Sequence, residues 1–301
     1  VDEHAQYQAE LNHLRGNFEA VESYCQTVDA AQPTFLCACS LRLATAVERG
    51  DYVNYSDTIK VLEAIAQKAK QPQDRLLAEM ACVLAAVSMY DGGHLPAWLQ
   101  EGDLSLFPHE ALPWALYIRV KYLEMQKRYD SMLATARTAL LFCSQPGMIS
   151  TVELYLRLSC AAAYNGLGDD RACASWLGDA LARALPHGLV TPFADTALSY
   201  GGMLEPLVQS RWPRYRESII GNPNISWKSW IAFHNQFAKD NITLVLSDQE
   251  YTLALHLAKG KTYSEAAKIM HLSVGRVKNL VSSIYAKLNI TNRKELKPFI
   301  L

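Results

Sequence analysis

Short turns recur at regular intervals through the first two thirds of this chain, and this recurrence constrains the fold more than any other feature. Between the turns, apolar residues follow helical spacing with almost no period-two alternation. The interval of about 34 to 42 residues is the length of one helix-turn-helix repeat. The sequence therefore predicts an all-α fold. The turns are Arg15-Gly-Asn17, Arg49-Gly-Asp51, Asp91-Gly-Gly93, Gln126-Lys-Arg128 and Leu167-Gly-Asp169.

The clearest copy of the repeat begins at Ala163. Gly168 is expected to end the first helix of this copy, because glycine adopts the left-handed conformation without strain. Small residues at 173 and 180 let the paired helices approach closely, and Pro186 ends the second helix. This pattern resembles the tetratricopeptide repeat (TPR), here in a degenerate form. Such repeats bury their apolar faces only against their neighbours, so they stack into a solenoid.

Residues 1–205 are accordingly predicted to form a TPR-like helical-repeat solenoid that senses a signal or binds a partner. Residues 184–207 resemble the end of the helical sensor domain of MalT-like regulators. Proline, glycine and tryptophan residues within 206–241 predict a linker whose short helices pack on the solenoid, with a hinge at Gly221-Asn-Pro-Asn224. MalT-like regulators normally carry an ATPase module before their repeats. Since these 301 residues hold none and begin at Val1, we expect a C-terminal piece of a longer polypeptide.

Charge is divided unevenly along the chain. Residues 242–301 carry a net charge of +5 and the remainder −6, giving −1 for the whole. A small basic module behind a larger acidic one suits a protein that binds a polyanion through one end. No apolar run reaches the ~18 residues of a membrane helix and no export signal is present, so we expect a cytoplasmic protein without membrane association. The seven cysteines form no Cys-x-x-Cys pair and are predicted to be buried thiols.

Helix boundary signals divide the last sixty residues into short helices. Each capping box predicts a helix start, because two side chains satisfy the free amides of the first turn. A glycine after an amphipathic run predicts a helix end. The signals are the capping patterns Ser247-Asp-Gln-Glu250 and Thr262-Tyr-Ser-Glu265, a stop at Gly260, and Ser273 as the cap of a third helix.

The third of these helices has two contrasting faces. At 100° per residue, Val277, Val281, Ile284 and Leu288 fall in one narrow stripe that should face the core. The opposite face is small and polar and has no carboxylate, as a helix lying between two phosphate backbones requires. That face consists of Gly275, Lys278, Asn279, Ser282, Ser283 and Ala286.

The residue types on and near this helix point to DNA. Lys278 and Asn279 lie early in the helix, where recognition helices meet base edges; lysine donates to guanine and asparagine pairs with adenine. Other cations are better placed to contact DNA phosphates, and such contacts raise affinity without reading the base sequence. These cations are Arg276, Lys287, Arg293 and Lys294.

Residues 246–296 resemble the LuxR-type helix-turn-helix domain through the motifs Leu-Ser-x-x-Glu, Gly, Ser-x-Gly-x-Val-Lys-Asn and Lys-Leu-x-Ile-x-Asn-Arg. The resemblance implies a four-helix DNA-binding domain over 242–301, which pairs as a homodimer through its last helix, about Arg293–Phe299. It places the DNA contacts of the family on Lys278, Asn279 and Ser282. The chain departs from the common Thr, His and Ile of the family at Arg276, Leu280 and Ala266.

These features predict a bacterial transcription regulator whose helical body receives a small-molecule effector or a protein partner and whose C-terminal module binds promoter DNA. The alternative is a TPR-like interaction scaffold whose C-terminal module docks on a protein or on RNA polymerase. Gly260-Lys-Thr262 lacks the upstream glycine and strand of a phosphate-binding loop. Because hydrolase and metalloprotease motifs are also absent, we predict no enzyme activity, no cofactor and no metal site.

Overall fold

The chain forms two compact units, Val1–Pro223 and Asn224–Leu301, here called the body and the head. Every regular element in the described residues is a helix, in agreement with the all-α prediction. None of the described helices is both long enough and apolar enough to cross a bilayer. The structure, a computed structural model, describes residues 3–88, 95–143, 150–200, 202–221, 246, 248–258, 260–270, 272–288 and 290–296.

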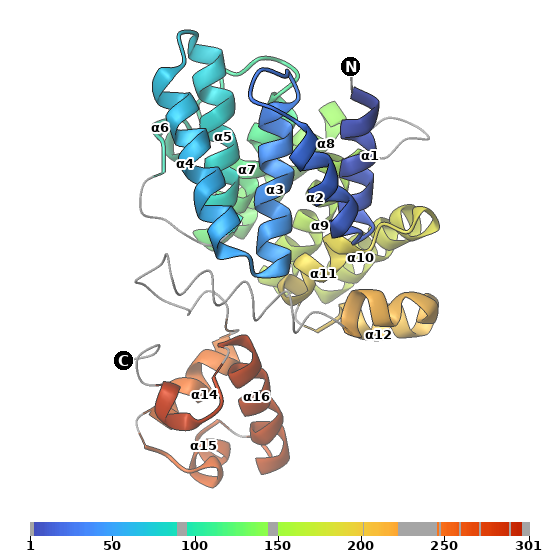
Figure 1. The fold of residues 1–301 in the computed structure, drawn as a ribbon. Helices are drawn as coiled ribbons and strands as arrows, with labels where there is room; N and C mark the ends of the chain where they lie inside the picture. The colour runs from blue at the N-terminus through green and yellow to red at the C-terminus, as the bar shows by residue number, and fades with distance from the viewer. Residues whose placement is uncertain are drawn as a thin grey trace. The chain divides into compact units, whose positions relative to one another are not determined.

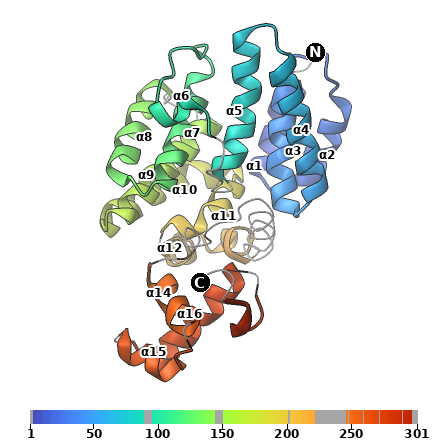
Figure 2. The same cartoon turned by 90° about the vertical axis from the view of Figure 1, so that its left-hand side faces the viewer.

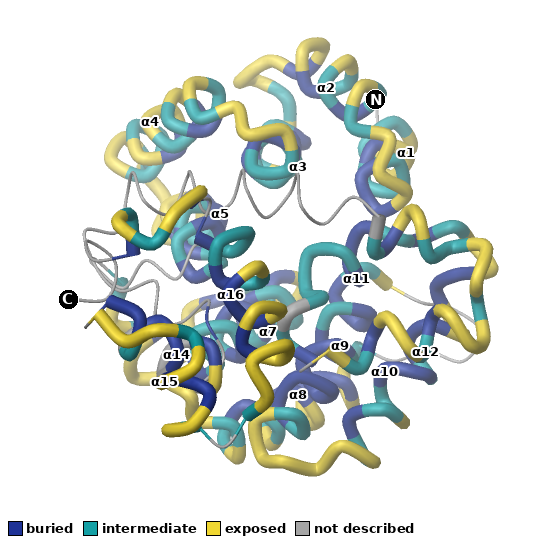
Figure 3. Tube along the Cα trace, turned by 90° about the horizontal axis from the view of Figure 1, so that it is seen from below, coloured by how far each residue is buried: buried dark blue, intermediate teal, exposed yellow. Residues whose placement is uncertain are grey.

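Most of the body consists of helices in two rows (Figure 1). In one row α1, α3, α5, α7 and α9 each contact the next, and in the other α2, α4, α8 and α10 pack on members of the first. Figure 3 shows buried, intermediate and exposed residues along single helices such as α4, as expected where one side of a helix is packed. The helices are α1 (Glu3–Leu14), α2 (Phe18–Thr27), α3 (Phe35–Arg49), α4 (Tyr52–Lys68), α5 (Pro72–Ser88), α6 (Ala97–Glu101), α7 (Leu112–Met125), α8 (Tyr129–Cys143), α9 (Thr151–Gly166) and α10 (Asp170–Ala184).

Four of the five predicted turns join paired helices as expected, and they share one geometry. At the α3–α4 turn Gly50 has φ +69°, and the next amide, that of Asp51, donates to the Ala46 carbonyl at 2.8 Å. This is the Schellman arrangement, which satisfies the last carbonyls of a helix. The same bonds recur around Gly16, Lys127 and Gly168, each with positive φ. The fifth predicted turn, at 91–93, lies outside the described residues.

Short helices complete the body after α10. Val208 of α12 and Ile219 of η4 are fully buried in the largest apolar core, so the first part of the predicted linker is folded with the body. The rest of the linker, residues 222–241, lies outside the described residues, and so does most of the predicted hinge at 221–224. The elements are η1 (Leu185–His187), α11 (Thr191–Asp195), η2 (Ala197–Tyr200), α12 (Leu204–Arg211), η3 (Pro213–Tyr215) and η4 (Glu217–Gly221).

The end of the body returns to its beginning, where α11 contacts α1 (Figure 2). The Val190 amide donates to the Leu14 carbonyl at 2.9 Å, and the Thr191 hydroxyl donates to the His13 carbonyl at 2.8 Å. Leu14 itself belongs to the core cluster formed by the later helices. The first helix is therefore held both by apolar packing and by hydrogen bonds from residues about 175 positions further along the chain.

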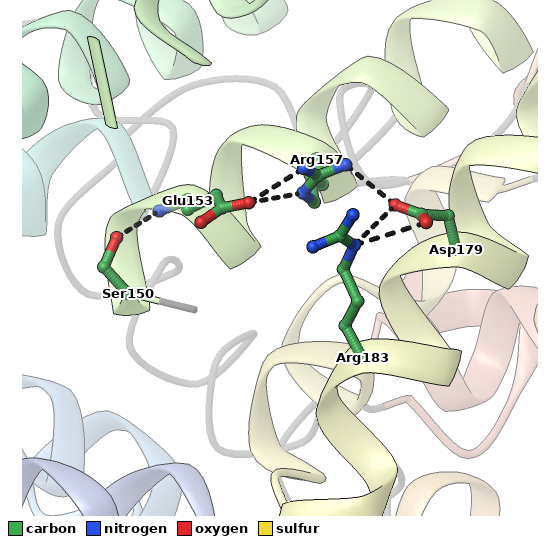
Figure 4. Close-up of polar contacts among 5 residues, drawn as sticks. All are labelled: Ser150, Glu153, Arg157, Asp179 and Arg183. Atoms are coloured by element: carbon green, nitrogen blue, oxygen red, sulfur yellow. Dashed lines mark hydrogen bonds and ion pairs between the residues drawn. The ribbon is translucent and has the colours of Figure 1, made fainter. Parts of the chain in front are cut away.

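A charged network joins α9 to α10 (Figure 4). Glu153 is only 1% exposed, and its Oε1 accepts hydrogen bonds from the Arg157 guanidinium at 2.8 and 2.9 Å. The Nη1 group of Arg157 lies 2.7 Å from Asp179 on α10. Arg183 contacts the same Asp179 carboxylate at 3.1 Å on the more exposed side. Arg157 is thus the cation that compensates the buried charge of Glu153.

His13 makes the seam between α1 and α11 sensitive to acid. Its side chain is buried and its Nε2 atom has no hydrogen-bond partner. Burial lowers the pKa of this imidazole from 6.5 to about 4. Because the folded-state pKa lies below the unfolded one, the stability that neutral His13 contributes is present above pH 6.5 and is lost as the pH falls towards 4.

The expected result is a loss of about 3 kcal/mol of unfolding free energy between pH 8 and pH 4 that depends on His13. It is measured as the difference between the wild-type protein and His13→Leu, which packs without a titratable group, in urea unfolding at each pH. His109 is exposed and serves as the matched control. Equal pH dependence in wild type and His13→Leu would show that this imidazole does not sense acid.

Candidate nucleic-acid interface

The described part of the head contains α14 (Asp248–Ala258), α15 (Tyr263–Ile269), α16 (Val274–Lys287) and the 3-10 helix η6 (Arg293–Leu296). α14 contacts the other three, and α15 contacts α16. The capping box predicted at Thr262 and Glu265 is present, and Ser273 caps α16 through the Arg276 amide at 3.1 Å. Gly260 lies just after α14 and has φ +95°, as expected for a glycine that ends a helix. These signals fix the end of α14 and the first residues of α15 and α16, the two helices of the helix-turn-helix.

The inner face of α16 is the one predicted from the sequence. Val277 and Ile284 are fully buried, Val281 and Leu288 nearly so. Leu280 is also buried, at 7% exposure, so it widens the packed stripe rather than facing outward. In this protein the position where LuxR-type sequences commonly have histidine therefore serves the core of the head.

The outer face of α16 carries the predicted contact residues. Arg276, Lys278, Asn279 and Ser282 are all exposed. The Ser282 hydroxyl donates to the Lys278 carbonyl at 3.1 Å within the helix. No Asp or Glu occurs anywhere in α16. Lys278, Asn279 and Ser282 share the outer face, and the exposed Arg276 lies at its edge in the first turn, so this accessible side of α16 offers no charge repulsion to a polyanion.

Ser283 and Lys287 lie elsewhere than the sequence suggested. Both reach Glu250 on α14, a carboxylate that is only 4% exposed: the Ser283 hydroxyl donates to it at 2.7 Å, and the Lys287 ammonium forms an ion pair with it. The sequence predicts a capping box between Glu250 and Ser247, but Ser247 lies outside the described residues. Glu250 is therefore a structural anchor between α14 and α16.

Arg293 also makes an internal contact, whereas Lys294 remains exposed. The Arg293 guanidinium donates twice to the Leu257 carbonyl, at 2.6 and 2.9 Å. Leu257 is in the last turn of α14, where carbonyls lack partners and a cation complements the helix dipole. Arg293 thus fastens η6 to α14. The predicted last helix extends to Phe299, and its residues 297–299 lie outside the described residues.

These placements predict different consequences for two lysines of the head. Lys287→Met should lower the unfolding free energy of the head by about 1–3 kcal/mol, because it leaves the buried Glu250 carboxylate without its cation. Lys294→Met should not, because its side chain is exposed. Amide hydrogen exchange of α14 and α16 measures the local stability directly. If both variants exchanged alike, the ion pair between α14 and α16 would be energetically unimportant.

Among the described Lys and Arg residues of the head, more are exposed than are engaged with other groups of the head, as Lys287 and Arg293 are. The exposed residues include two on or beside α15 that sequence reasoning did not single out. The exposed set is Lys261, Lys268, Arg276, Lys278 and Lys294. Among the described residues, no group of His, Cys, Asp and Glu side chains is arranged to hold a metal ion.

Comparison with protein families matches residues 244–298 to GerE, described as bacterial regulatory proteins of the luxR family. The match lies within the head, includes α14, α15, α16 and η6, and agrees with their helix-turn-helix geometry. It supports a DNA-binding transcription regulator and a LuxR-type module at this end of the chain. Comparisons with curated proteins and with solved structures found no match.

Proposed function

We propose that this protein regulates transcription by placing α16 in the major groove of promoter DNA, under the control of a signal received by the body. The observation that carries the proposal is the exposed side of α16, which combines cations, an amide and a hydroxyl without any carboxylate. The major groove of DNA admits one α-helix and presents the hydrogen-bond donors and acceptors of the base edges to it. A helix that follows a short turn and carries such a polar, cationic surface suits this groove.

Within this proposal the residues have separate roles. Lys278 and Asn279 read base edges, with Ser282 beside them on the next turn. Arg276 and Lys294 contact phosphates, a role that their exposure supports. Lys287 and Arg293 act structurally, since their side chains are engaged with Glu250 and Leu257.

Residues 1–205 are proposed to form a TPR-like solenoid, residues 206–241 a linker, and residues 242–301 the LuxR-type helix-turn-helix domain. The two rows of paired helices in the body support that proposal. An effector or protein partner that binds one arrangement of the body better than another shifts the population of DNA-binding states. Pairing of two heads through the last helix, about 293–299, would address two half-sites about 34 Å apart.

The test is binding-site selection from random DNA duplexes with the full chain, followed by titration of the selected duplex at several salt concentrations. We expect one enriched sequence, bound about 10³- to 10⁷-fold more tightly than random duplex, with affinity that falls steeply with salt. An unenriched pool would contradict the proposal and favour the scaffold alternative, in which the head docks on a protein.

A further inference from the structure

A stretch of basic and aromatic residues lies near the end of the described part of the body. Residues 206–216 contain three arginines and no aspartate or glutamate, whereas residues 1–241 as a whole carry a net charge of −6. The stretch begins within α12 and ends at the residue after η3 (Figure 1). Its arginines are therefore a local exception to the acidity of the body.

Two aromatic residues of this stretch are fixed to the body. Trp212 and Tyr215 are half-buried and pack against the largest apolar core. The Tyr215 hydroxyl also donates a hydrogen bond to the Leu185 carbonyl at 2.5 Å. Because packing and this hydrogen bond restrict the two rings, they provide rigid supports at the surface of the body.

Two arginines lie over these rings. The Cζ atom of Arg211 is 5.2 Å from the centre of the Trp212 ring, and that of Arg214 is 4.7 Å from the centre of the Tyr215 ring. Arg211 also lies against α10, where a Cβ atom on Gly178 would be 3.4 Å from its Nη1. The Arg214 guanidinium donates to the Tyr215 hydroxyl at 3.0 Å. Stacking on an aromatic face holds a guanidinium in place and leaves N–H groups at its edge for a ligand.

The charge of these two arginines is not balanced inside the body. Both side chains are exposed, and in the described part of the chain neither forms an ion pair with a carboxylate. Arg216 differs, because it is paired with Glu205. A fixed guanidinium with free N–H groups suits a phosphate, which accepts two parallel hydrogen bonds from it. Arg211 and Arg214 therefore have the chemistry of a phosphate-binding surface.

We propose that Arg211 and Arg214 form a second DNA-binding surface, which contacts backbone phosphates of the duplex that flanks the site bound by the head. This proposal rests on the proposed function, since the head must first hold the duplex. Residues 222–245 connect the body to α14 and its preceding Leu246, and a chain of 24 residues spans at most about 90 Å. The tether makes the second contact intramolecular and raises its effective concentration. Phosphate contacts carry no sequence information, so a flank of any sequence serves.

The test compares the selected duplex alone with the same duplex extended by about 30 base pairs of arbitrary sequence on each side, which covers the span of the connecting chain. Affinity of the full chain for each duplex is measured at several salt concentrations. Each neutralised phosphate adds about 0.9 to the slope of log affinity against log salt. For each protein copy bound, the slope should therefore be steeper by about 2 on the extended duplex. Arg211→Gln combined with Arg214→Gln should remove this difference, whereas Arg211→Lys combined with Arg214→Lys should keep it, because the charges remain.

Arg75→Gln combined with Arg128→Gln is the matched control, because it removes the same charge from exposed side chains on other elements of the body. This variant should keep the difference between the two slopes. Equal slopes on the two duplexes in the wild-type protein, or an unchanged difference in the double glutamine variant, would overturn the second surface while the selected site stands. An unenriched pool in the selection would instead overturn the proposed function, and the second surface with it.

Discussion

Replacing Arg157 with leucine is expected to lower the unfolding free energy of the body by about 3–5 kcal/mol, because it leaves the Glu153 carboxylate buried without a cation. Glu153 is 1% exposed, so its carboxylate is not solvated where it lies. Urea unfolding followed by tryptophan fluorescence measures this change. All six tryptophans precede residue 231, so their signal does not come from the LuxR-type module.

Two further variants separate the buried charge from the ion pairs around it. Arg183→Leu removes the contact to Asp179 on the exposed side, where both partners are more than 40% exposed, and should cost under about 1 kcal/mol. Glu153→Gln in the Arg157→Leu background removes the stranded charge and should recover part of the loss. Equal effects of Arg157→Leu and Arg183→Leu would mean that burial of Glu153 does not determine the energy.

The parts of this fold that the sequence predicted are those governed by nearby residues. The turns at Gly50 and Gly168 follow from left-handed glycine followed by aspartate, and the capping box at Thr262 needs only four residues. The buried stripe of α16 follows from helical periodicity. In each case the interacting residues lie within one or two helical turns of each other, so their spacing in the sequence is sufficient to predict the structure.

The contacts that the sequence did not predict join residues that are distant along the chain. The sequence of α16 alone predicts a phosphate contact for Lys287, because its partner on α14 lies 37 residues earlier. The sequence predicts a phosphate contact for Arg293 as well, because its acceptor is a backbone carbonyl, which no side-chain pattern reveals. Such contacts follow from tertiary packing rather than local pattern.

The second large effect is expected on DNA recognition. Replacing both Lys278 and Asn279 with alanine should reduce the preference for the selected duplex over random duplex by about 2–6 kcal/mol, because each good base contact contributes about 1–3 kcal/mol of discrimination. Both side chains are exposed, so the fold of the head should be unaffected. Competition binding with selected and random duplexes at fixed salt measures the preference.

Lys294→Ala provides the contrast, since a phosphate contact carries no sequence information. It should weaken binding to both duplexes equally and reduce the slope of log affinity against log salt by about 1. The double alanine variant should do the reverse, losing preference while keeping residual salt-dependent binding. The two variants are expected to change different measured quantities, so the opposite pattern would contradict the proposal. If Lys294→Ala removed the sequence preference and the double variant did not, the outer face of α16 would not be the surface that reads the bases.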